Sequence, residues 1–162
     1  MSRTGMPTHE DAQLILRLYD LRREEKLRAA RDWFNGTFFP ESIEQIREIQ
    51  AARSQENAYF RMVLSYWDMA ASFVEYGTMN GELFLESSGE MLLVWAKIEP
   101  FIPQMRQDAD LPAYLSNIEK VVSRSQWAQE RIQWFRKRIA EARKRIQGSG
   151  QPATPADADG GS

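Results

Sequence analysis

The 162-residue chain contains no cysteine and only one histidine, His9. Without cysteine it can form no disulfide, zinc–thiolate site, cysteine nucleophile or iron–sulfur cluster, and such a composition suits a reducing cytoplasm. One imidazole cannot supply the paired Glu-x-x-His motifs of helical di-iron proteins. We therefore expect no metal or other cofactor, and we interpret His9 as a solvated residue near the start of a helix.

Long apolar runs and a strong net charge are also missing. The longest unbroken apolar run extends from Met91 to Ala96, far short of the roughly 20 residues that cross a bilayer, and the first residues do not resemble a signal peptide. Lysine and arginine total 21 against 23 acidic residues, a net charge of −2. These values exclude a wholly basic nucleic-acid coat and an acidic disordered chain. We expect a cytoplasmic protein with no membrane partner.

Both ends of the chain are poor in residues that form a core. Residues 148–162 contain no large apolar side chain, and residues 1–7 offer little more. Such segments cannot bury enough apolar surface to offset the entropy lost on ordering. We predict a flexible N-terminus over residues 1–7, a helical domain over 8–147 and a disordered tail over 148–162.

Between these ends the apolar residues recur with helical spacing, and no stretch alternates as a strand would. The sequence predicts an all-α, single-domain bundle of about six to seven helices with a long C-terminal helix. The expected helices cover residues 8–36, 42–53, 55–76, a short segment around 83–85, 89–98, 101–107, a helix opened by Leu111 and Pro112, and a last helix that Ser123 or Ser125 caps and that ends near 147. The Thr8 hydroxyl should cap the first helix by accepting the free amide near Asp11, and the chain should break near Gly89.

The helix over residues 55–76 is expected to be the most buried, because two neighbouring apolar stripes run along it. Its polar edge carries Arg61, Asp68, Ser72 and Glu75. This edge is either a solvated face, a buried network that includes Arg106 or Lys97, or the wall of a ligand pocket, since buried charges must be paired. The candidate network comprises Arg61, Asp68, Ser72, Glu75 and Arg106.

No catalytic motif is visible. Glu82, Glu86 and Glu90 lie four residues apart, a spacing in which like charges repel and which is typical of a solvated face. The chain lacks a Gly-x-Ser-x-Gly or Ser-x-x-Lys nucleophile and a glycine-rich phosphate loop. We expect the protein not to be an enzyme.

Charge segregation is the strongest surface signal. Residues 120–147 hold nine lysines and arginines against two glutamates, a local charge of +7 that the rest of the chain must balance. The same segment carries an apolar heptad seam, which needs a partner helix. We call this the apolar seam, and it consists of Ala128, Ile132, Phe135, Ile139, Ala142 and Ile146. Either this chain or a second copy can supply the acidic and apolar partner surface. The candidate interaction surface comprises Trp127, Arg131, Trp134, Arg138, Ile139 and Arg145.

Three segments carry a resemblance to a known family: LYDLRREEKLRAARDWF at residues 18–34, NAYFRMVLSYWDMAASFVEYG at 57–77 and GEMLLVWAKIEPFIPQMR at 89–106. Over residues 9–122 the chain resembles a group of uncharacterised bacterial all-helical proteins of unknown function. The resemblance implies a helical fold and carries over no catalytic or binding residue.

Three functional hypotheses remain at this point. The first is a non-enzymatic helical interaction module whose partner is a second copy of itself or another protein, with no nucleic acid. The second is a small-molecule-binding or catalytic bundle with a site along Asp68, Ser72 and Glu75. The third is an accessory protein that binds nucleic acid or an anionic surface through the basic C-terminal helix.

Overall fold

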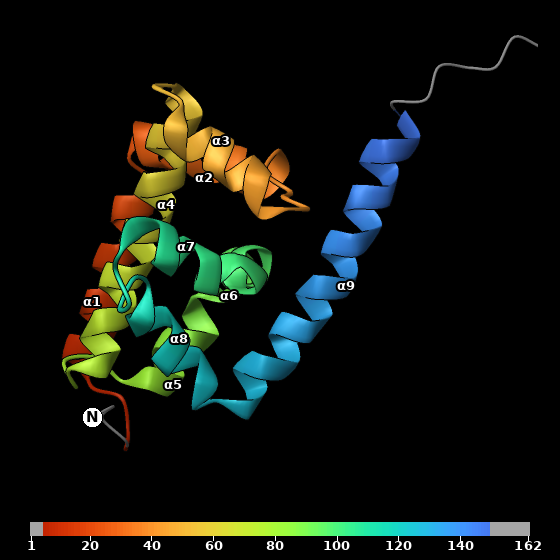
Figure 1. Ribbon diagram of the computed structural model, residues 1–162. Helices are drawn as coiled ribbons and strands as arrows, with labels where there is room; N and C mark the ends of the chain where they lie inside the picture. The colour runs from red at the N-terminus through yellow and green to blue at the C-terminus, as the bar shows by residue number, and fades with distance from the viewer. Residues whose placement is uncertain (1–4, 150–162) are drawn as a thin grey trace, which may run out of the picture.

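The computed structural model describes residues 5–149 and is helical throughout, with no strand in that range (Figure 1). The expected all-α class and the long C-terminal helix are therefore confirmed. The elements are α1 (His9–Arg22), α2 (Glu25–Gly36), α3 (Ile43–Ala51), α4 (Gln55–Glu75), α5 (Gly81–Ser87), α6 (Gly89–Ile98), the 3-10 helix η1 (Glu99–Phe101), α7 (Ile102–Ala109), α8 (Ser116–Ser123) and α9 (Gln126–Ser149).

Residues 5–149 form more α-helices than the six to seven expected, because some of the expected helices are divided. The single helix expected over residues 8–36 is wrong, because the chain breaks between α1 and α2. Thr8 caps α1 through a capping box with Asp11, as expected, but a second helix starts after Glu24, whose carboxylate accepts the Leu27 N–H at 2.9 Å. No glycine or proline marks this break, so the helical period hides it. The break is marked instead by Glu24, which caps the first turn of α2.

Other boundaries differ from the expectation for similar reasons. The break near Gly89 is confirmed, yet α6 starts without a side-chain cap. The helix expected to open at Leu111 begins only at Ser116, because the intervening residues form turns and Leu115 adopts a positive φ of 56°.

Helix α4 packs against α2, α8 and α3. Its Phe60, Val63, Leu64 and Trp67 are each at most 1% exposed. Aromatic rings from α2 and the following loop join Phe60 in one cluster, with the Phe34 and Phe38 centroids 4.8 Å apart. The buried side chains of α4 are Phe60, Val63, Leu64, Tyr66, Trp67, Ala70, Ala71 and Val74. The expectation that this helix is the most enclosed is wrong, because α4 buries eight of its 21 residues whereas the shorter α6 buries seven of ten.

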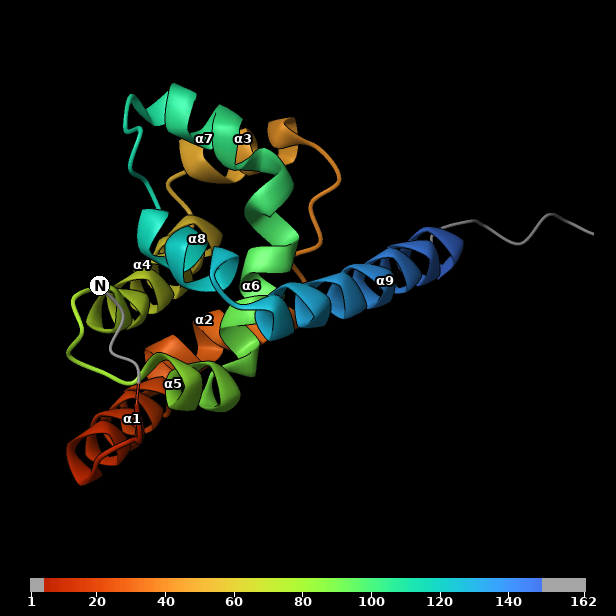
Figure 2. The same ribbon diagram turned by 90° about the horizontal axis from the view of Figure 1, so that it is seen from below.

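Helix α9 lies along the side of the molecule opposite α1, and both views show its C-terminal half extending away from the other helices (Figures 1 and 2). Its N-terminal half packs on α6, and Ser125 caps it by accepting the Ala128 N–H at 3.2 Å. The helix continues to Ser149, so the first two residues of the expected tail are helical. The remainder of that tail, and most of the expected flexible N-terminus, lie outside the described residues.

In the described part of the chain, no helix combines the length and the apolar character that a membrane span requires.

Trp67 provides a direct test of this core. Its side chain is 1% exposed, so Trp67→Ala should lower the free energy of unfolding by about 3–5 kcal/mol, the usual cost of emptying a large aromatic site. Tyr76, which is 83% exposed, is the matched aromatic control, and Tyr76→Ala should cost less than about 0.5 kcal/mol. Urea denaturation measures both; a loss below about 1 kcal/mol for Trp67→Ala would contradict the enclosed position.

Candidate interaction surface

The polar edge of α4 is directed at the start of α8. One carboxylate oxygen of Asp68 accepts the N–H groups of Asn117 and Ile118, at 3.1 and 3.2 Å, and the other accepts the Asn117 side-chain amide at 2.9 Å. Helix α8 has no side-chain cap of its own, and the N–H groups of its first turn need acceptors. Asp68 therefore caps a neighbouring helix, which explains a charged residue at this position.

The other members of the expected polar network likewise have partners outside that network. Glu75 forms an ion pair with Arg124, with 2.5 Å between the charged groups. Arg106 donates to the Tyr114 carbonyl at 3.0 Å and pairs with Glu119 at 2.6 Å. The Ser72 hydroxyl donates to the Met69 carbonyl of its own helix, and Arg61 is exposed. Asp68, Glu75 and Arg106 thus hold α4, α7 and α8 together.

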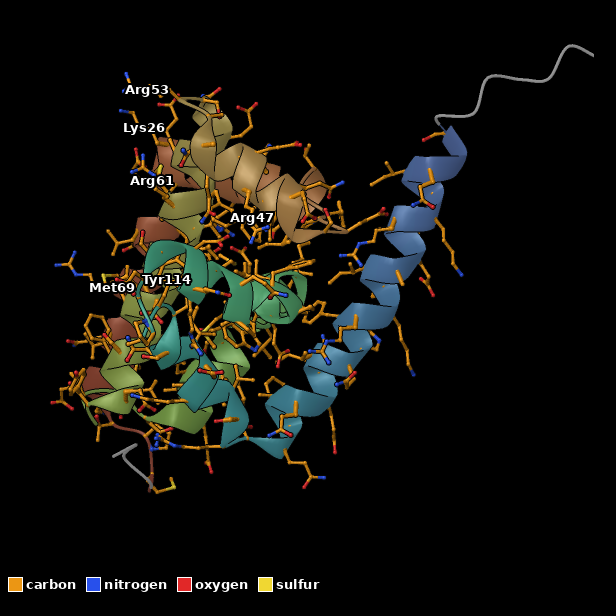
Figure 3. The ribbon with its side chains drawn as sticks, viewed as in Figure 1. Lys26, Arg47, Arg53, Arg61, Met69 and Tyr114 are labelled. Carbon is orange, nitrogen blue, oxygen red and sulfur yellow. The ribbon has the colours of Figure 1, made fainter. Side chains whose placement is uncertain are left out.

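An open hollow of about 680 Å³ lies beside Arg61, between the α3–α4 turn and the loop that precedes α8. Arg53, Asn57 and Tyr114 contribute to its lining. Figure 3 shows Lys26, Arg53 and Arg61 along one outer edge of the molecule. Because Asp68, Ser72 and Glu75 do not line it, the hollow differs from the pocket expected from the sequence. Among residues 5–149, no three acidic or histidine side chains gather as metal ligands would.

Lys97 is the most unusual buried group, with a side chain only 1% exposed. Its Nζ donates to the carbonyl oxygens of Phe34, Asn35 and Phe38 at 2.6, 3.0 and 2.8 Å and lies 3.7 Å from the centre of the Phe39 ring. The first two carbonyls belong to the last turn of α2, where acceptors remain without helical partners. Lys97 thus holds α6 against the C-terminal end of α2.

Burial lowers the pKa of Lys97 to about 7, and the positive charge of Arg143 acts in the same direction. An exposed lysine titrates at about 10.4. The amine of the folded protein consequently loses its proton more easily than the amine of the unfolded chain.

The outer face of α9 carries exposed tryptophans between arginines. Trp127 is 47% exposed and Trp134 is 41% exposed. The guanidinium carbons of Arg131 and Arg138 lie 4.4 and 4.9 Å from the centre of the Trp134 ring. Both distances are those of cation–π contacts, so one indole receives two guanidinium groups. Five of the six residues expected on the interaction surface lie on this exposed part of α9: Trp127, Arg131, Trp134, Arg138 and Arg145.

Ile139, the sixth residue of that expected surface, lies elsewhere. It is 4% exposed and belongs to the seam that packs against the rest of the chain. As far as Ile139, the apolar seam found in the sequence therefore has its partner within the same molecule, chiefly α6, whereas Ile146 at its end is 53% exposed. Arg136 pairs with Glu99, and Arg143 donates to the Pro40 carbonyl, so polar contacts hold α9 along this line.

Sequence reasoning missed a second seam on α9. Its members recur at the same alternating spacing of four and three residues as the apolar seam but follow the exposed face. Glu141 belongs to it and was not among the expected surface residues. The spacing alone would have revealed it. The seam, which we call the outer seam, consists of Trp127, Arg131, Trp134, Arg138, Glu141 and Arg145, all exposed.

Comparison with known proteins places the chain in a family. A model described as a domain of unknown function, DUF4760, matches residues 7–125. The chain belongs to the DUF4760 family. The expected membership of an uncharacterised family is confirmed, and the DUF4760 match ends just before α9. No curated protein and no solved structure matches the chain.

The capping role of Asp68 predicts a defined cost of substitution. Asp68→Ala removes the acceptor of two N–H groups of α8, so the free energy of unfolding should fall by about 1–2 kcal/mol. Ser72→Ala is the control from the same edge, because its hydroxyl bonds only to its own helix, and it should cost less than about 0.5 kcal/mol. Equal stability of Asp68→Ala and the parent in urea denaturation would contradict the cap.

The pKa of Lys97 predicts a pH dependence of stability. Between about pH 7 and about pH 10 the unfolded chain keeps the lysine proton while the folded protein has lost it, so stability should rise with pH across this window. The rise should be a few kcal/mol at most, since one pKa unit corresponds to about 1.4 kcal/mol. Tyr66, whose pKa burial raises to about 12, titrates above this range.

Urea unfolding at several pH values measures the slope, and Lys97→Met should flatten it. Lys144→Met, which removes an exposed lysine of α9, should leave the slope unchanged. A stability that falls across the same window, and does so only when Lys97 is present, would show that the fold requires the ammonium form.

Proposed function

We propose that this chain is a single-domain, non-enzymatic helical interaction module of the cytoplasm that associates with a second copy of itself. Residues 8–147 form one bundle in this proposal, and the outer seam of α9 is the contact surface. The observation that carries the proposal is the pair of exposed indoles on α9, one of which contacts both Arg131 and Arg138.

Exposed tryptophan and arginine are the residues most enriched at protein–protein contact centres. Two guanidinium contacts restrict the indole before it binds, so it has less conformational entropy to lose on binding. The polar edge of α4 supports the same view, since Asp68 and Glu75 act in contacts to α8 and Arg124. Those carboxylates are therefore occupied in holding the fold together.

A phosphate-rich partner is the competing explanation of the basic helix. The chain as a whole has a net charge of −2, which gives little long-range attraction to a nucleic acid. Two basic residues of α9 are also engaged within the molecule, Arg136 with Glu99 and Arg143 with the Pro40 carbonyl. These facts favour a protein partner.

Light scattering tests the proposal over protein concentrations from about 1 to about 100 μM, where contacts of modest affinity dissociate. The parent should reach twice the monomer mass at the upper end. Trp134→Ala should weaken the dimer at least about tenfold, the typical effect at an aromatic contact centre. Gln133→Ala, which changes the neighbouring exposed residue, is the control and should behave like the parent.

A titration of duplex DNA on the same samples separates the competing function. At physiological salt the parent should show no binding in the micromolar range. A parent that stays monomeric throughout, together with micromolar DNA binding that weakens steeply with salt, would overturn the proposal and favour a nucleic-acid contact.

A further inference from the structure

We infer that two copies pair through the outer seam of α9 in an antiparallel arrangement centred on residue 136. This inference rests on the proposed self-association and specifies its geometry. The six residues of the outer seam are spaced by four, three, four, three and four positions, which is the spacing of one face of a coiled coil. Each of them is exposed on the structure of the single chain.

The order of residues in the outer seam is self-complementary when the partner helix runs in the opposite direction. About residue 136, Trp127 faces Arg145 of the second copy, Arg131 faces Glu141, and Trp134 faces Arg138. Twofold symmetry repeats each pair. The contact then contains four indole–guanidinium pairs and two ion pairs, and no arginine faces an arginine.

A parallel arrangement in register lacks this complementarity. Arg131, Arg138 and Arg145 would each face their own counterparts, and Glu141 would face Glu141. Like charges placed opposite one another disfavour a contact strongly. Antiparallel registers shifted by one heptad keep complementary pairs but leave only four of the six seam positions of each copy paired. The full antiparallel register is therefore preferred.

The second copy has room to approach. At about 100° per residue, the outer seam lies roughly 110° around α9 from the side chains that face α6. Figures 1 and 2 show α9 at the outer side of the molecule, with its C-terminal half extending from the other helices. From Trp127 to Arg145 the seam is about 27 Å long. The twofold axis is perpendicular to the plane of the two antiparallel helices, so the two folded bodies would lie on the same face of the pair, towards its opposite ends.

The chemistry of the outer seam also distinguishes it from the apolar seam. Cation–π contacts and exposed ion pairs are individually weak and depend on partner geometry. The contacts of Arg131 and Arg138 with Trp134 already exist in the single chain, so pairing adds further partners to the same side chains. Such a contact is reversible and sensitive to charge.

A charge exchange tests the register. Arg131→Glu places a new carboxylate opposite Glu141 of the second copy, and Glu141→Arg places two guanidinium groups opposite each other. Each single variant should weaken the dimer at least about tenfold, and the double variant should restore the parent affinity. Lys144→Glu, a charge reversal on another exposed face of α9, should have no comparable effect. Circular dichroism confirms that each variant is folded.

Crosslinking provides an independent readout, because the chain contains no cysteine. Trp127→Cys and Arg145→Cys should crosslink poorly as single variants and efficiently when mixed, since their thiols face each other only between copies of opposite direction. Trp127→Cys that crosslinks to itself as readily as to Arg145→Cys would overturn the register.

The outcomes separate the two proposals. A parent dimer with charge rescue and mixed crosslinks supports both. A parent dimer that neither single charge variant weakens leaves the self-association intact and refutes the antiparallel register. A parent that remains monomeric at all concentrations refutes the proposed self-association and the register with it.

Discussion

The burial of the apolar face of α4 is the constraint on which the rest of the structure depends. Phe60, Val63 and Trp67 are buried against α2, α3 and α8, so the partly buried carboxylates beside that face must find partners. Asp68 does so by capping α8, and Glu75 by pairing with Arg124 at the junction of α8 and α9. The burial of α4 thereby determines where α8 begins and from which point α9 departs.

The buried lysine follows from the same close packing on the other side of the molecule. The end of α2 is covered by α6 and the aromatic residues near Phe38, so its last carbonyls need partners within the protein. Lys97 supplies donors to three carbonyls from near the end of α6, and satisfying several acceptors offsets the cost of burying an amine. Other residues of α6 pack against α9.

The sequence was sufficient for features that depend on periodicity and insufficient for those that depend on single contacts. Helical spacing identified α4 and the apolar seam of α9, and residue type identified the cap at Thr8. Neither could locate the break at Glu24, because a carboxylate cap inside a continuous helical period leaves no mark on hydropathy. The spacing placed Asp68 and Glu75 on one edge but not against α8, since partners about 50 residues away are set by tertiary packing.

Helix α9 carries both the apolar seam and the outer seam, and the two seams differ in chemistry. The apolar seam stabilises the single folded chain, because Ile132 and Ile139 are almost fully buried in it. Separating these side chains from their neighbours would expose apolar surface to water. The outer seam consists of exposed indoles and charged groups, and water solvates the charged groups well. Covering the seam therefore gains little binding free energy unless the opposing surface matches it position by position. An apolar surface on the outer seam would favour indiscriminate association. In the proposed dimer, the alternating tryptophan and arginine residues make association conditional on direction and register, which is what a specific and reversible contact between folded copies requires.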